Sequence, residues 1–261
     1  MTGNLLWRGM LAGLVAALLS FGLFKVAGEP LVDRAIAFEK TMDEAAAKAK
    51  ADEAAAKGLP APVEEAEPEL VSRPVQGGIG LLTGVVVFGT ALGGLFAIAF
   101  ALALGRMGDF SPRATSALLA AAGFVSVYLV PFFKYPPNPP SVGLPDTIGM
   151  RTGLYFSVVL ISLAVMIVAG LLRGKLDRPL GSWNAALIAA AFYLAAIAGV
   201  TLALPVVNEV PEGFPADLLW KFRIVSAAAQ ALVWTTLGLL FGAFAESLVG
   251  VKKPAFRPAI V

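Results

Sequence analysis

The sequence contains no cysteine and no histidine. Without cysteine the chain cannot form a disulfide or offer a thiolate to a metal ion. Without histidine it lacks the commonest metal ligand, the usual acid/base group near neutral pH, and any Ser-His or Cys-His catalytic arrangement. We therefore expect no catalytic site, no metal site and no cofactor-binding site within this chain, and do not expect an enzyme.

Charge is also scarce, since only 15% of the 261 residues are charged while 58% are hydrophobic. Soluble proteins carry roughly 25% charged residues, and the mean hydropathy here is +0.80. A net charge of +2 is too small to predict nucleic-acid binding. A water-soluble surface cannot be built from this composition, so we expect the chain to reside in a lipid bilayer.

Six apolar segments recur along the chain, each close to the ~20 residues that cross a bilayer as a helix. They cover approximately residues 5–27, 75–104, 114–133, 152–172, 183–204 and 224–249. The sequence therefore predicts an all-α membrane bundle of about six transmembrane helices. We divide it into a first transmembrane helix (1–28), a helical arm with a linker outside the cytoplasm (29–74) and helices two to six (75–261).

The first apolar segment has two interpretations. Its early arginine, Arg8, suits a signal peptide, but Lys25 interrupts the region where cleavage is expected. A retained first transmembrane helix is the favoured interpretation.

The segment that follows is rich in Ala, Glu, Lys and Asp. Glu44 with Lys48 and Glu53 with Lys57 have the favourable four-residue helical spacing, and such repeats form semi-rigid helical spacers. A thin apolar stripe at helical spacing comprises Leu31, Ala35, Phe38, Met42, Ala45 and Ala49. The arm is either a solvated helix leaning on the bundle or a helix that docks a partner. Residues 60–74 form a Pro- and Glu-rich linker that need not be ordered.

Basic residues in short loops predict orientation, because they concentrate on the cytoplasmic side. With the N-terminus inside, the cytoplasmic set is Arg8, Arg106, Arg113, Arg173, Lys175, Arg178, Lys252, Lys253 and Arg257. The opposite side then receives Lys134, Arg151, Lys221 and Arg223. Both termini are therefore predicted to be cytoplasmic.

Under this topology the six helices form three out-and-back hairpins. Helices two, four and six each follow an outer arginine, namely Arg73, Arg151 and Arg223. Three repeated hairpins are one interpretation, and chance likeness among alanine-rich helices is the other. Glycine pairs at small-xxx-small spacing predict close helix packing, with a pore lining as the alternative. The pairs are Gly9 with Gly13, Gly80 with Gly84, Gly89 with Gly93, and Gly238 with Gly242.

Charged and polar residues gather near the predicted outer ends of the helices. The candidates for a substrate path or gate are Glu29, Lys134, Asn138, Asp146, Arg151, Glu209, Asp217 and Arg223. One interpretation is an outer vestibule in which acids balance bases, and the other is a set of interfacial anchors. The four prolines between Lys134 and Pro140 cannot continue a helix, so this stretch is expected to form a stiff extended cover.

Several stretches resemble the CbtA family of predicted cobalt transporter subunits. They are Glu29-Pro30, Ser72-Arg-Pro-Val-Gln76, Tyr128-Leu-Val-Pro-Phe-Phe-Lys-Tyr-Pro-Pro-Asn-Pro-Pro140, Thr147-Ile-Gly-Met-Arg-Thr152 and Leu180-Gly-Ser-Trp-Asn-Ala185. The resemblance implies a bacterial inner-membrane subunit that acts with a small single-helix CbtB-like partner, whose histidine-bearing tail handles the metal. A chain without His or Cys is consistent with that division of labour.

Two functional hypotheses follow. The first is a membrane subunit of a transporter for cobalt or a related divalent cation, whose helices form the path. The second is a structural or assembly subunit that transports nothing and recruits an extracytoplasmic partner through its arm. The sequence leaves the oligomeric state open.

Overall fold

The computed structural model describes residues 2–60 and 70–249, and within these ranges it contains helices and no strand. The helices, in chain order, are α1 (Thr2–Leu23), η1 (Phe24–Gly28), α2 (Glu29–Ala56), α3 (Arg73–Val75), η2 (Gln76–Gly80), α4 (Leu81–Ala103), α5 (Pro112–Gly123), η3 (Phe124–Leu129), α6 (Val130–Lys134), η4 (Pro145–Thr147), α7 (Ile148–Ala203), α8 (Ala216–Thr236), η5 (Leu237–Phe241) and α9 (Gly242–Val249). Part of the predicted linker, residues 61–69, and the basic residues Lys252, Lys253 and Arg257 lie outside the described ranges.

Consecutive elements join into five helices that are long and apolar enough to cross a membrane. They span Thr2–Ala56, Arg73–Ala103, Pro112–Lys134, Pro145–Ala203 and Ala216–Val249. Two of the predicted transmembrane segments, 152–172 and 183–204, thus fall within the single element α7.

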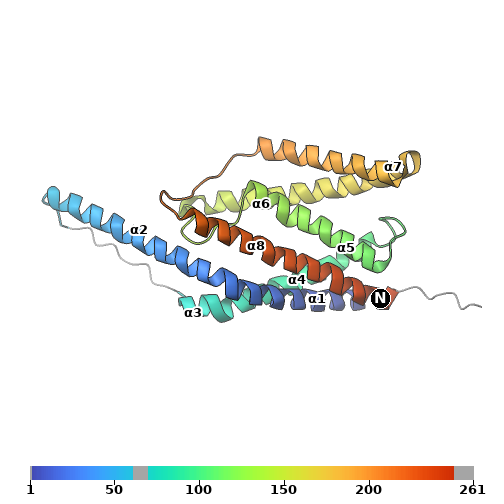
Figure 1. Cartoon of the computed structure of the whole chain (residues 1–261), viewed down its shortest axis with the longest axis horizontal. Helices are drawn as coiled ribbons and strands as arrows, with labels where there is room; N and C mark the ends of the chain where they lie inside the picture. Colours follow the sequence, from blue (N-terminus) through green and yellow to red (C-terminus); the bar gives the residue numbers. More distant parts are fainter. Residues whose placement is uncertain (1, 61–69, 250–261) are drawn as a thin grey trace, which may run out of the picture.

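Helix α7 is broken at Gly181, whose φ of 76° and ψ of 157° are not helical. In Figure 1 its ribbon turns back there, so that two arms run side by side. A buried hydrogen bond of 2.7 Å between the hydroxyls of Ser162 and Tyr193 joins these arms, and Val158 and Ala189 belong to the same apolar cluster. Pro179, just before the break, cannot donate a helical hydrogen bond.

The first two spanning helices meet through glycine. A Cβ added to Gly9, Gly13 or Gly93 would collide with backbone atoms of the facing helix, and one added to Gly89 would collide with the Ala17 side chain. The predicted packing role of these two glycine pairs is therefore confirmed. The expectation fails for Gly84, where a Cβ would meet nothing within 4 Å.

At the centre of the bundle, α5 packs against η5 and α9. The glycines of the fourth predicted pair, Gly238 and Gly242, lie against α5, and the Ser116 hydroxyl donates to the Gly238 carbonyl at 2.8 Å. Phe96 and Phe100 pack edge-on against Phe241 with ring centroids 5.5 and 5.0 Å apart. Such contacts hold α4 to the last spanning helix.

The predicted arm is α2, and it continues α1 without a loop, so that one helix runs from Thr2 to Ala56 (Figure 1). Its first turns lean on the bundle, because Leu31 and Ala35 are buried in a cluster with α8. Phe38 lies edge-on to Phe214 at 5.0 Å. Beyond Thr41 nearly every residue is exposed, so only the first half of the apolar stripe is covered by this chain.

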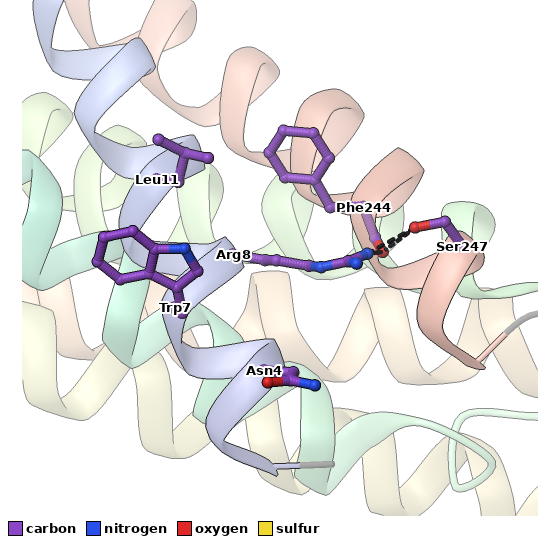
Figure 2. A pocket seen from close by; sticks show the side chains of 6 residues that line it. All are labelled: Asn4, Trp7, Arg8, Leu11, Phe244 and Ser247. Carbon is purple, nitrogen blue, oxygen red and sulfur yellow. Dashed lines mark hydrogen bonds between the residues drawn. The ribbon is translucent and has the colours of Figure 1, made fainter.

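The bundle has two distinct ends (Figure 1). The N-terminus and the end of α9 lie at one end, here called the terminal end. There the Arg8 guanidinium donates to the Phe244 carbonyl and the Ser247 hydroxyl, both at 2.5 Å (Figure 2), and Arg113 pairs with Glu246. The opposite end, from which α2 projects, is called the arm end.

Candidate functional site: a cavity at the arm end

A cavity of about 470 Å³ lies at the arm end. It is lined by η3, the connection after α6, the start of α7, the connection after α7, and α8. The connection after α6 leaves the helix at Tyr135, and Pro136, Pro137 and Asn138 form part of the wall in non-helical conformation. The proline-rich stretch thus leaves the helix, as expected, and contributes to the cavity wall.

The cavity wall combines aromatic and other apolar side chains with several polar ones. The aromatic residues are Tyr128, Phe132, Tyr135, Tyr155 and Phe156. The charged and amide residues are Asn138, Arg151, Asn208, Glu209 and Arg223. A largely apolar concavity with a few polar groups is the usual form of a small-molecule site.

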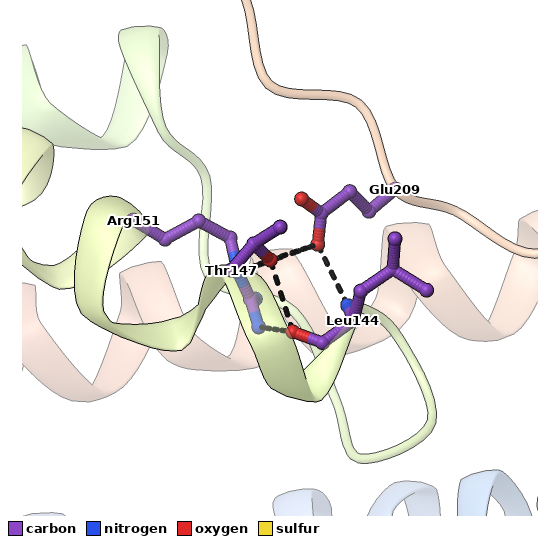
Figure 3. Close-up of polar contacts among 4 residues, drawn as sticks. All are labelled: Leu144, Thr147, Arg151 and Glu209. Atoms are coloured by element: carbon purple, nitrogen blue, oxygen red, sulfur yellow. Dashed lines mark hydrogen bonds and ion pairs between the residues drawn. The ribbon is translucent and has the colours of Figure 1, made fainter.

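A group of polar contacts in this cavity surrounds Glu209 (Figure 3). Its Oε2 accepts hydrogen bonds from the Leu144 backbone amide at 2.7 Å and from the Thr147 hydroxyl at 2.8 Å. Arg151 Nε lies 3.3 Å from the same oxygen, and its guanidinium also donates to Thr147 Oγ1 and to the Leu144 carbonyl, each at 3.0 Å. The hydrogen bond from the Leu144 amide, the hydrogen bond from Thr147 and the charge of Arg151 all favour the ionised carboxylate. The pKa of Glu209 is therefore lowered, with the Leu144 amide as the largest cause.

Gly143 makes room for the Arg151 guanidinium. A Cβ on Gly143 would collide with three atoms of that group, and its φ of 122° is unfavourable for residues with a side chain. The glycine thus lets the connection after α6 pass close to the charge.

Arg223 is held quite differently from Arg151. One terminal nitrogen donates to Asn138 Oδ1 at 2.8 Å, while its Nε is buried without a hydrogen-bond partner. Within residues 2–60 and 70–249, no carboxylate lies within ion-pair distance of Arg223. The Tyr128 hydroxyl, in the same cavity wall, is also buried without a partner.

Four of the eight predicted site residues line this one cavity: Asn138, Arg151, Glu209 and Arg223. The vestibule hypothesis expected acids to balance bases without assigning pairs, and among these four residues Glu209 lies beside Arg151.

The other four predicted residues lie elsewhere. Lys134 donates to the Thr201 and Leu204 carbonyls at the end of α7, at 2.7 and 2.8 Å. Asp146 is exposed and does not line the cavity.

The remaining two acids pair with basic residues outside the cavity. Glu29 lies 2.7 Å from Arg73. Unlike the other two outer arginines, Arg151 and Arg223, Arg73 does not line the cavity. Asp217 pairs with Lys221 at 3.2 Å and with Arg34 at 3.5 Å.

The aromatic residues of the cavity wall were not predicted from the sequence as part of a site. Tyr128, Phe132 and Pro136 are four residues apart, as are Arg151 and Tyr155, and this spacing marks one side of a helix. That signal was weak, because aromatic residues near helix ends are also common interfacial anchors.

Within the described part of the chain, no three Asp or Glu side chains gather closely enough to hold a metal ion. The acids at the arm end are instead spread over separate contacts with Arg73, Arg151 and Lys221.

Five long apolar helices define this chain as a multi-pass membrane protein of the helical-bundle class. The model of one protein family, described as probable cobalt transporter subunit (CbtA), matches residues 2–246. The chain therefore belongs to the CbtA family. No curated protein and no solved structure matches it.

Proposed function

We propose that the chain forms the transmembrane path of a transporter for cobalt or a related divalent cation in the bacterial inner membrane. A small single-helix CbtB-like subunit would capture the metal, and the chain itself would act neither as an enzyme nor as the holder of a resident cofactor. The observation that carries this proposal is the family match over residues 2–246. Additional support comes from the five helices that are long and apolar enough to cross a membrane.

The proposal includes six transmembrane helices with both termini in the cytoplasm. Support for six comes from the break at Gly181, which gives α7 two arms of membrane-spanning length. Support for the orientation comes from the basic residues of the terminal end, because short cytoplasmic loops are enriched in Lys and Arg. Helix α2 and the arm-end cavity would then face outward.

The donor set of the cavity supports the division of labour between two subunits. Its one carboxylate, Glu209, is already engaged by Leu144, Thr147 and Arg151. Borderline divalent metals favour imidazole ligands where these are available. The cavity alone would therefore not hold the metal, and tight capture would be supplied by the partner.

Cobalt accumulation tests the proposal in cells that express the chain with its small partner, the chain alone, or neither. We expect uptake above the empty-membrane level only with both subunits. Arg151→Ala should reduce it strongly, whereas Lys221→Ala, at an exposed pair of the same end, should not. Equal cobalt content in all strains, with the proteins present in the membrane, would refute a transport role.

One observation favours the assembly hypothesis as a second candidate. The half of α2 beyond Thr41 projects from the bundle and is exposed, as a docking helix would be. Deleting residues 41–57 leaves Leu31 and Ala35 in place, so the bundle should persist. Loss of partner co-purification, together with unchanged cobalt uptake in the Arg151→Ala variant, would favour assembly over transport.

A further inference from the structure

The arm-end cavity carries a net positive charge. It is lined by two guanidinium groups, Arg151 and Arg223, and by one carboxylate, Glu209. Glu209 is matched to Arg151, so the charge of Arg223 remains without a counter-charge among the described residues. Removing a cation from water is costly unless an anion or several acceptors replace the lost hydration.

Two hydrogen-bond donors of this wall lack an acceptor. They are Arg223 Nε and the Tyr128 hydroxyl, each buried without a partner. The neutral oxygen of Asn138 satisfies only one guanidinium nitrogen. Guanidinium is suited to planar, two-pronged binding of carboxylate or phosphate, so an oxyanion would supply acceptors and counter-charge together.

The rest of the cavity wall favours an anion that carries an apolar group. Phe132, Tyr155 and Phe156 line the same cavity, and its volume of about 470 Å³ lies within the roughly 300–1,000 Å³ typical of small-molecule sites. Inorganic phosphate would leave this apolar surface uncovered. An organic body would cover it and gain from the burial of apolar area.

We propose that the arm-end cavity binds an organic anion, a carboxylate or phosphate on an apolar body, with Arg223 as its principal charge partner. This goes beyond the proposed function and does not depend on it, since binding is measured on the isolated chain whether or not cobalt crosses the membrane. A bare divalent cation is repelled by the same guanidinium.

The test uses the purified full chain in a neutral detergent, titrated calorimetrically with benzoate. Benzamide serves as the neutral analogue of the same shape, and inorganic phosphate and cobalt chloride serve as the anion without a body and the bare cation. We expect benzoate to bind at least about tenfold more tightly than each of the other three, since a charged hydrogen bond is worth that much or more.

Four variants test whether the bound anion contacts Arg223 and Tyr128. Arg223→Gln should weaken benzoate binding at least tenfold, Arg223→Lys should recover part of it, and Lys221→Gln, on the exposed side of the same helix, should not change it. Tyr128→Phe removes only an unpartnered hydroxyl. It should weaken benzoate binding without lowering the melting temperature, which keeps the test valid if Arg223→Gln fails to fold.

Competition identifies the source of the anion. Displacement of benzoate by dioctanoyl phosphatidylglycerol would assign the site to a lipid headgroup, and no displacement would assign it to a free solute; both support the anion site. Absence of benzoate binding, equal binding of benzoate and benzamide, or benzoate affinity unchanged in both Arg223→Gln and Tyr128→Phe would overturn it.

Discussion

Arg151, in the first turn of α7, pairs with Glu209, in the connection that follows the end of α7. The ion pair of 3.3 Å thereby closes the two ends of the α7 hairpin. The amide of Leu144 and the hydroxyl of Thr147 bind the same carboxylate oxygen. The charge of Glu209 should therefore control how firmly these connections are held.

The contribution of Glu209 should depend on pH. Its pKa is lower in the folded chain than its ordinary value of 4.5, so the ionised carboxylate stabilises the fold above about pH 4.5 and loses this effect as pH falls through the lowered pKa. We expect Glu209→Gln to lower the melting temperature in detergent near neutral pH, and this difference from the unmodified chain should shrink on acidification. A difference that stays constant with pH would attribute the effect to shape alone.

The glycine interface predicts a strong dependence on side-chain size. Gly93→Ala places a methyl group against the backbone of Gly9 and Gly13, and such overpacking costs typically about 1–3 kcal/mol. Gly84→Ala is the matched control on the same helix, where a Cβ meets nothing within 4 Å. Thermal unfolding in detergent should show a loss for the first variant and no loss for the second. Equal melting temperatures would contradict the packing role.

Lys134 should hold the end of α7 in place. Its ammonium group binds the Thr201 and Leu204 carbonyls, where a cation also interacts favourably with the helix dipole. Lys134→Met keeps the apolar stem and removes the charge, so backbone hydrogen exchange should become faster over residues 200–210. Lys175→Met, at the terminal end, provides the control. Unchanged exchange in the Lys134→Met variant would rule out this anchoring role.

The absence of cysteine allows a direct test of topology, because any introduced thiol is the only one in the chain. Lys57→Cys and Glu212→Cys should react with a membrane-impermeant maleimide added to intact spheroplasts. Asp109→Cys and Lys175→Cys should react only after permeabilisation. Accessibility of Lys175→Cys from outside would show that the two arms of α7 do not cross the membrane as proposed.

Much of the fold was predictable because membrane spans and close helix contacts depend on local composition. Hydropathy located the five long apolar helices of the described residues, and glycine spacing predicted the contact of Gly9 with Gly93. The continuity of α1 with α2 was not anticipated at Glu29, because Pro30 and the change of composition there suggested a boundary. The helix instead continues past Pro30 after the π-helical turn at Phe24–Gly28, a form that occurs inside longer α-helices.

A contact in the site could be predicted from the sequence where it joins two opposite charges. It could not be predicted where a side chain binds backbone groups. One interpretation of the outer charged residues was that acids balance bases there, and Arg151 does lie within ion-pair distance of Glu209. The partners of Lys134 are carbonyls, which every residue carries and no sequence pattern distinguishes. The repeat of three hairpins stays a prediction, as does the functional role of the eight candidate residues.

Because α1 continues into α2 as one helix, a tilt of the membrane helix also moves the tip of the arm. Helix α2 has 28 residues, so at 1.5 Å per residue its tip lies about 40 Å from its base. A ten-degree tilt of the membrane helix would sweep that tip through about 7 Å. A subunit bound to the tip would therefore move when the membrane helices rearrange. Equally, its own movement would shift helices that it does not contact.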